Sequence, residues 1–247
     1  QVTTLARGIA TSYSGTNTNV NFNGHLDFQP DLVWTKCRSD AYDHNWVDSV
    51  RGINPNGTLY ALSSNLTGTQ TDSTNNVLSL DANGFTVQGT GSRTNAIGRD
   101  YVSWAWKAGG AAVSNTAGTI TSQVSANTDA GFSIVKYTGT GGSAGQTESI
   151  GHGLSTTPEL IIVKNLDSAY NWYVRVEGIT SNSQVLQLNL TNALGTPSQT
   201  PWGTPTDSTF LVGRSSLNVN ENNSEMVAYC FHSVDGYQKI GTYTASS

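Results

Sequence analysis

Apolar and polar residues alternate along most of this chain in short segments, and clusters of Gly, Asn, Pro or Asp separate these segments. An alternation with a period of two is typical of β-strands that bury one face, and such clusters are typical of turns. Helical periodicity is missing between the segments. The pattern therefore predicts an all-β chain, with its strongest strands over residues 31–37, 45–50, 84–89, 101–107, 159–165, 171–178, 183–190, 209–214 and 226–232.

The second half of the chain repeats the first. The segment PDLVWTKCRSDAYDHNWVDSVRG, from Pro30, reappears as PELIIVKNLDSAYNWYVRVEG, from Pro158. Further matches follow in unchanged order, 124 to 128 residues apart, and they include YVSWAWK at 101–107 with MVAYCFH at 226–232. The repeat predicts two tandem antiparallel β-sandwich domains of the same fold, over residues 1–112 and 131–247. Residues 113–130, which are rich in Ala, Gly, Ser and Thr, are then the linker.

Matching Trp46 with Trp172 aligns the two copies at their most distinctive residue. In that alignment Val174 and Glu177 take the places of Asp48 and Arg51. A polar site built on Asp48 and Arg51 would then exist once per chain.

The end of the chain carries a third version of the opening strand. Residues 237–245, within GYQKIGTYTA, resemble the segments around Tyr13 and Tyr137. This terminal strand either closes the second sandwich beside its own first strand, or pairs with a neighbouring module or subunit. The second interpretation would make the chain an assembly protein.

Composition and charge exclude some partners. The formal net charge is −5, and the 12 Lys and Arg residues form no run. Nucleic-acid binding needs clustered cations, so we expect no nucleic-acid partner. No apolar stretch approaches the roughly 20 residues of a membrane-spanning helix, so we expect no membrane insertion.

Aromatic residues are the candidates for glycan binding, because their rings stack on the apolar faces of sugars. Tyr42, Trp46, Tyr170 and Trp172 recur in or after the same loop of each copy, and Trp202 lies in the Pro- and Gly-rich loop PSQTPWGTP. Core packing is the alternative for the repeated Trp pair, since each precedes an apolar strand. We expect Trp202 to be exposed.

Three acidic residues, Asp40, Asp43 and Asp48, could converge near one hairpin. Paired carboxylates would suit glycoside hydrolysis, and clustered carboxylates would suit Ca²⁺. The spacing matches no known calcium loop, and Asp in loops commonly caps the backbone. Asp48 could also form a structural ion pair with Arg51. We therefore expect no catalytic residues, no metal and no cofactor, with these three acids as weak metal candidates.

Two cysteines, Cys37 and Cys230, occupy positions that are not equivalent in the two copies. Two cysteines also cannot form a disulfide framework. We expect two free thiols packed within strands.

Several segments resemble a family of tandem β-domain proteins from the tail fibres and virions of marine bacteriophages. The resemblance covers nearly the whole chain, and its motifs are PDLVWTKCR at 30–38, WVDSVRG at 46–52, DANGFTV at 81–87, YVSWAWKAGG at 101–110, GHGLSTTPELIIVK at 151–164 and GYQKIGTYT at 236–244. It implies a lectin-like sandwich of jelly-roll or concanavalin-like architecture, and a structural component of a virion. The family supplies no catalytic residues to transfer.

The expected function is that of a non-enzymatic virion protein, such as a tail-fibre, tail-associated or capsid-decorating component. It would act in assembly and host-surface adhesion, with itself, other virion proteins and a host polysaccharide as partners. The alternative is a free-standing carbohydrate-binding module or a bacterial surface adhesin.

Overall fold

The computed structural model describes residues 7–13, 20, 21, 23, 24, 26–214 and 216–244. Its regular structure is β-strand apart from one short helix, α1 (Leu217–Asn220). The predicted all-β fold is confirmed. The strands pair in antiparallel fashion in four sheets, which we number 1 to 4.

Sheets 1 and 2 form the first body. Sheet 1 has the order β1 (Arg7–Tyr13), β7 (Arg99–Trp106), β3 (Leu32–Cys37) and β4 (Asn45–Asp48). Sheet 2 has the order β2 (Val20–Asn21), β6 (Gly84–Val87) and β5 (Val77–Asp81). Alternate residues of β3, β4 and β7 face sheet 2, and the first core between the two sheets contains Val33, Val47, Phe85, Val87 and Ala105.

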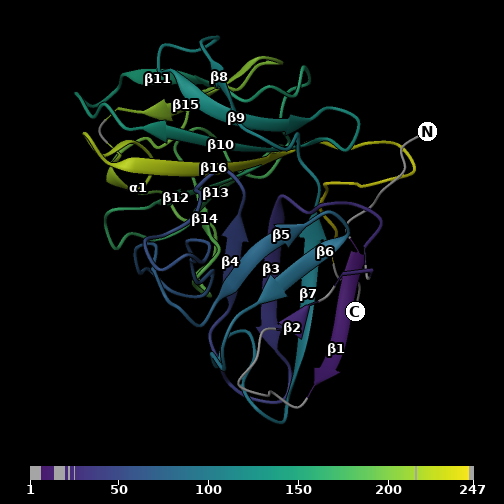
Figure 1. Cartoon of the computed structure of the whole chain (residues 1–247). Helices are drawn as coiled ribbons and strands as arrows, with labels where there is room; N and C mark the ends of the chain where they lie inside the picture. The colour runs from purple at the N-terminus through teal and green to yellow at the C-terminus, as the bar shows by residue number, and fades with distance from the viewer. Residues whose placement is uncertain (1–6, 14–19, 22, 25, 215, 245–247) are drawn as a thin grey trace.

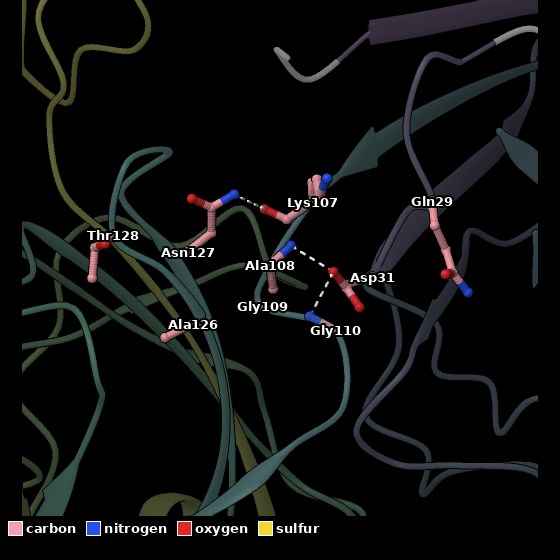
Figure 2. Close-up of a pocket in the computed structure, with 9 residues that line it drawn as sticks. All are labelled: Gln29, Asp31, Lys107, Ala108, Gly109, Gly110, Ala126, Asn127 and Thr128. Carbon is pink, nitrogen blue, oxygen red and sulfur yellow. Dashed lines mark hydrogen bonds between the residues drawn. The ribbon is translucent and has the colours of Figure 1, made fainter. Parts of the chain in front are cut away.

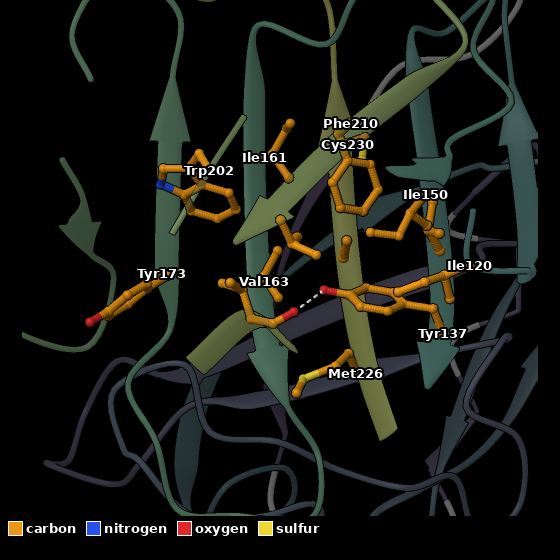
Figure 3. Close-up of a cluster of buried hydrophobic side chains, with 14 of the residues drawn as sticks. Ile120, Tyr137, Ile150, Ile161, Val163, Tyr173, Trp202, Phe210, Met226 and Cys230 are labelled. Atoms are coloured by element: carbon orange, nitrogen blue, oxygen red, sulfur yellow. Dashed lines mark hydrogen bonds between the residues drawn. The ribbon is translucent and has the colours of Figure 1, made fainter. Parts of the chain in front are cut away.

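Sheets 3 and 4 form the second body. Sheet 3 has the order β14 (Leu186–Gln187), β13 (Tyr173–Val176), β12 (Leu160–Asn165), β16 (Glu225–Phe231), β10 (Phe132–Thr138), β9 (Ser122–Asn127) and β8 (Val113–Asn115). Sheet 4 pairs β11 (Thr147–Gly151) with β15 (Thr209–Gly213). Figure 3 shows the second core between them, where the hydroxyl of Tyr137 donates a 2.6 Å hydrogen bond to the carbonyl of Val219.

A third core joins the two bodies. It packs the face of sheet 1 that points away from sheet 2 against the face of sheet 3 that points away from sheet 4. Its buried members include Leu32 and Trp46 from sheet 1 and Ile162, Trp172 and Tyr229 from or beside sheet 3. The four sheets are therefore stacked as four layers, in the order 2, 1, 3 and 4. Figure 1 shows the second body above the first.

The central strands of the two bodies follow one order. Sheet 1 runs β4-β3-β7-β1, and sheet 3 contains β13-β12-β16-β10 in the same succession. Each strand in the first series is the sequence-repeat counterpart of the strand at the same place in the second. The division of the chain into two separate domains stays a prediction, because the third core makes the two bodies one packed unit.

Strand register corrects the alignment of Trp46 with Trp172. Trp46 pairs with Trp34 in β3, whereas the equivalent residue of β12, Ile162, pairs with Val174. Trp46 therefore matches Val174, and Trp172 matches His44. Register follows the backbone pairing, and identical side chains two residues apart do not override it.

Two asparagines confirm this register. The backbone N–H of His44 donates to the side-chain oxygen of Asn65 at 3.0 Å, and that of Trp172 donates to Asn189 at 2.9 Å. Asn65 and Asn189 are themselves matched by the sequence repeat. The two asparagines therefore accept a hydrogen bond from matched backbone N–H groups in the two hairpins.

Three expectations about individual segments were wrong. The expected linker, residues 113–130, contains β8 and β9, and β9 pairs with the outer edge of β10. β9 thereby takes the place expected for the terminal strand, and residues 239–244 form no strand. The strand expected over residues 183–190 shortens to β14, and Leu188 and Leu190, which follow it, are partly exposed.

Candidate functional site

Trp46 and Trp172 lie together, but inside the third core. Their ring centroids are 5.5 Å apart, and both side chains are buried. The indole N–H of Trp172 donates to the carbonyl of Leu66 at 3.0 Å. Neither ring has a free face for a sugar, so this pair packs the two bodies against each other.

Trp202 is buried, and the expectation that it is exposed was wrong. Only 1% of its surface is accessible, and its indole N–H donates to the carbonyl of Gln184 at 3.1 Å. A β-bridge to Val212 draws the Pro- and Gly-rich loop against β15. Figure 3 shows the ring in the second core beside Ile161.

Tyr42 and Tyr170 are half-buried and lie at matched places in the β3–β4 and β12–β13 hairpin loops. The hydroxyl of Tyr170 reaches Glu221 at 3.5 Å. These two tyrosines are the predicted glycan residues that keep accessible surface. The five predicted aromatic residues are thus divided between two cores and two loops.

A lysine holds each of these hairpin loops. The ammonium of Lys36 donates to the carbonyls of Cys37 at 2.7 Å and Tyr42 at 2.9 Å. Its counterpart Lys164 is fully buried and donates to the carbonyl of Asn165 at 2.6 Å. Burial lowers the pKa of Lys164 to about 8.

The three candidate acids form ion pairs with three different arginines and do not converge. Asp40 pairs with Arg99 at 3.1 Å, and Asp43 pairs with Arg93 at 3.5 Å. Asp48 is buried in the third core. Within the part of the chain that the structure describes, no three His, Cys, Asp or Glu side chains gather as metal ligands would. The arrangement offers neither paired catalytic carboxylates nor a calcium cage.

Asp48 is the centre of a buried polar network. Its carboxylate accepts hydrogen bonds from Arg51 Nε at 2.5 Å and from the hydroxyl of Tyr229 at 2.7 Å. It also accepts the backbone N–H groups of Val50 and Arg51. Arg51 donates further to the carbonyl of Trp46 at 3.0 Å. The network satisfies the buried carboxylate and links the two bodies.

A pocket of about 430 Å³ lies where the two bodies meet (Figure 2). Its carboxylate, Asp31, accepts backbone N–H groups from Ala108 at 2.8 Å and Gly110 at 3.4 Å. Asp31 also accepts the hydroxyl of Ser49 at 2.9 Å. Burial raises the pKa of Asp31. Because its oxygens are engaged by these donors, Asp31 fixes the exit from β7 rather than facing a ligand.

A second pocket of about 410 Å³ opens in the first body, and no sequence pattern predicted it. Among the residues that the structure describes, its polar lining consists of amides and hydroxyls, with Arg93 as the only charged side chain. Asn45 contributes to it from β4, and Asn76 from the residue before β5. One available signal was the polar Asn45 beside Trp46 and Val47, but its meaning depends on the register.

The C-terminal segment is exposed. Residues 241–244 lie on the surface, and 93% of the Tyr243 side chain is accessible. Among the described residues, β1 is an edge strand of sheet 1, whereas its counterpart β10 has β9 on its outer side. The first body thus has an open edge at the place where the second body has a paired strand.

None of the described helices is both long and apolar enough to cross a bilayer. Neither the curated proteins nor the solved structures contain a match to this chain. A family model described as "Domain of unknown function (DUF7483)" matches residues 9–247 and so spans both bodies. With nearly its whole length covered, the chain belongs to the DUF7483 family.

Proposed function

We propose that this chain is a non-enzymatic structural protein of a phage virion, such as a tail-fibre, tail-associated or capsid-decorating component. Its role is assembly with copies of itself and with other virion proteins, and adhesion to a host-surface polysaccharide. Assembly rests on the C-terminal segment, and adhesion on the amide-lined pocket of the first body.

One observation supports assembly above the others. Ile240, Tyr243 and Thr244 have the spacing of Ile134, Tyr137 and Thr138 in β10. In β10 the Ile and Tyr side chains are buried, whereas Tyr243 is exposed and its segment has no strand partner among the described residues. A segment with the pattern of a buried first strand is thus presented at the surface.

The partner that fits this segment is the open edge of β1 in another copy. An edge strand carries unpaired N–H and C=O groups, which an extended segment can satisfy by adding a strand. β9 adds to β10 in this way within the chain. Residues 240–244 of one copy would then add to β1 of the next, which gives a head-to-tail contact that closes into a ring or extends as a fibre.

The test is the mass of the purified chain in solution by light scattering, for the intact chain and for a variant ending at Ile240. Ending at Ile240 keeps the residue that packs on the third core. We expect the intact chain to form a trimer or larger assembly, and the truncated chain to be a monomer. Monomers in both samples would contradict the assembly mechanism.

Substitutions that keep the full length of the chain test whether strand pairing, rather than the mere presence of the terminal residues, drives assembly. Replacing both Thr242 and Tyr243 with Pro removes backbone donors on both sides of the segment and should release monomers. The control Thr242→Val keeps every backbone donor and favours extended structure, so it should assemble as the parent does. Assembly that survives the double proline variant would contradict pairing through this segment.

A further inference from the structure

The pocket of the first body is a built polar site. Its lining includes Asn45 of β4 in sheet 1 and Asn76 beside β5 of sheet 2, together with Thr71, Ser73 and Arg93. Its volume of about 410 Å³ falls in the range of small-molecule sites. Asn45 lies on the same face of β4 as the core residue Val47, so its amide points inward from a rigid strand.

Two lining amides have unused hydrogen-bonding capacity. Among the described residues, the side-chain nitrogen of Asn45 and the side-chain oxygen of Asn76 have no hydrogen-bond partner. The two residues are 2% and 1% exposed. Buried amides are nearly always paired, because leaving them unpaired is costly. Both residues line the pocket, so a free donor and a free acceptor lie beside it and could be satisfied by a ligand that has both groups.

In the second body, the position that matches Asn45 carries a different residue. Asn45 pairs with Thr35, and at the matched place Tyr173 pairs with Val163. Tyr173 belongs to the second core, where Figure 3 labels it near Trp202. An aromatic residue thus takes the position of Asn45, although the two bodies share their central strand order.

Asn76 also has a counterpart in the second body that is not an amide. The N–H of Gln88 donates to the carbonyl of Asn76 at 2.7 Å, and the N–H of Gly213 donates to that of Pro201 at 2.8 Å. Pro201 is therefore the counterpart of Asn76. Both amides are replaced in the second body by side chains without an amide, although Asn76 Nδ2 also donates to the carbonyl of Leu59 at 2.7 Å in the first body.

The lining specifies the ligand class. Amides and hydroxyls donate and accept, which suits a molecule with several hydroxyl groups. The described lining residues include no carboxylate, and their single charge is the guanidinium of Arg93. Arg93 contacts Asp43 at 3.5 Å, and both side chains are about one-third exposed. Such a loose, solvated pair leaves Arg93 able to bind a ligand carboxylate.

We propose that this pocket binds one sugar unit of a polysaccharide, with Asn45 and Asn76 on its hydroxyls and Arg93 on the carboxylate of a hexuronic acid. This proposal rests on the adhesion part of the proposed function and is independent of strand pairing by the C-terminal segment. The truncated monomer should bind the sugar as well as the intact chain does, so the failure of either idea can be recognised alone.

The experiment is a titration of the ¹⁵N-labelled truncated chain, ending at Ile240, with galacturonic acid and with galactose, which differ in the carboxylate. Side-chain amide signals in ¹⁵N–¹H correlation spectra report directly on the two asparagines. We expect galacturonic acid to shift the signals of Asn45 and Asn76, and galactose to do so more weakly. If neither sugar moves these signals at millimolar concentration, the proposal is wrong.

Variants locate the contact. Asn45→Tyr copies Tyr173 of the second body and should weaken binding by at least about tenfold. The matched control is Asn127→Tyr, in the pocket between the two bodies, which should bind as the parent does. Arg93→Gln should remove the preference for galacturonic acid and keep the weaker binding of galactose. Equal loss of binding in Asn45→Tyr and Asn127→Tyr would overturn the assignment to this pocket. If Asn45→Tyr fails to fold, the signal shifts of Asn45 and Asn76 in the unsubstituted chain still test the assignment.

Discussion

The hydroxyl of Tyr229 donates a 2.7 Å hydrogen bond to Oδ2 of Asp48, although the two residues are 181 positions apart. Asp48 ends β4 in sheet 1, and Tyr229 lies in β16 of sheet 3. The bond therefore crosses the third core. It couples a buried ion pair in the first body to a central strand of the second.

We expect Asp48→Ala to lower the free energy of unfolding by about 3 to 5 kcal/mol, because it leaves Arg51 charged and buried without its partner. Tyr229→Phe removes one bond and should cost about 1 to 2 kcal/mol. Urea denaturation measures both. The control Asp40→Ala breaks a solvated surface pair and should change stability far less. An equal effect of Asp48→Ala and Asp40→Ala would show that the network adds nothing.

Alternating patterns predicted the central strands well. β3 alternates in burial along most of its length, whereas β12 was recognised from its continuous apolar run and is buried on both faces. β9, SQVSAN, was missed because Ser and Asn give it the composition of a linker. Its buried serines are polar positions that only the sheet pairing explains, and Ser122 donates to the carbonyl of Gly151 at 3.0 Å.

The candidate site was less predictable than the fold. Pro and Gly around Trp202 correctly indicated a loop, but the burial of that loop depends on a bridge to Val212. The significance of Asn45 depends on register, because a shift by one residue would direct its amide to the other face of sheet 1. Composition also cannot tell which of many asparagines lacks a partner. The burial of the Trp202 loop, the direction of the Asn45 amide and the lack of a partner all depend on tertiary packing.

We expect the two bodies to unfold together. The third core buries residues of both, including Leu32, Phe132 and Ile162, so separating the bodies would expose apolar surface on each. Differential scanning calorimetry should show one transition, with a calorimetric enthalpy equal to the van't Hoff enthalpy. Two resolved transitions would contradict this coupling.

Trp172→Ala tests the same core at one position. Trp172 is fully buried and contacts Trp46 across the interface, so its truncation leaves a large cavity. We expect a loss of about 3 to 5 kcal/mol in the free energy of unfolding, measured by urea denaturation. Tyr243→Ala is the control, since that side chain is exposed and its loss should leave the stability of the monomer unchanged.

The cysteine thiols should not react in the folded chain. Cys37 and Cys230 are free and buried, as the sequence predicted, and burial raises the pKa of Cys230 strongly. The thiolate is the reactive form, so both effects protect the sulfur. A thiol reagent should modify neither cysteine at neutral pH and both after unfolding in guanidinium. Rapid labelling of Cys230 in the native state would show that the second core opens.

Lys164 should make stability rise with pH in mildly alkaline solution. Its pKa is lowered by burial from 10.5 to about 8, so between these values the folded chain binds fewer protons than the unfolded chain. Unfolding then takes up a proton, and each pH unit in this window should add up to about 1.4 kcal/mol to the free energy of unfolding.

Urea denaturation of the parent and of Lys164→Met from about pH 7, below the folded pKa of about 8, to about pH 9.5, inside the window, tests this. Burial raises the pKa of Cys230 above its ordinary 9.0 and those of Tyr137 and Tyr229 above 10, and these groups act with opposite sign but equally in both chains. The stability of the parent relative to Lys164→Met should therefore increase with pH. A difference that stays constant would mean that Lys164 keeps its ordinary pKa and that its bonds to the hairpin carbonyls offset the cost of burial.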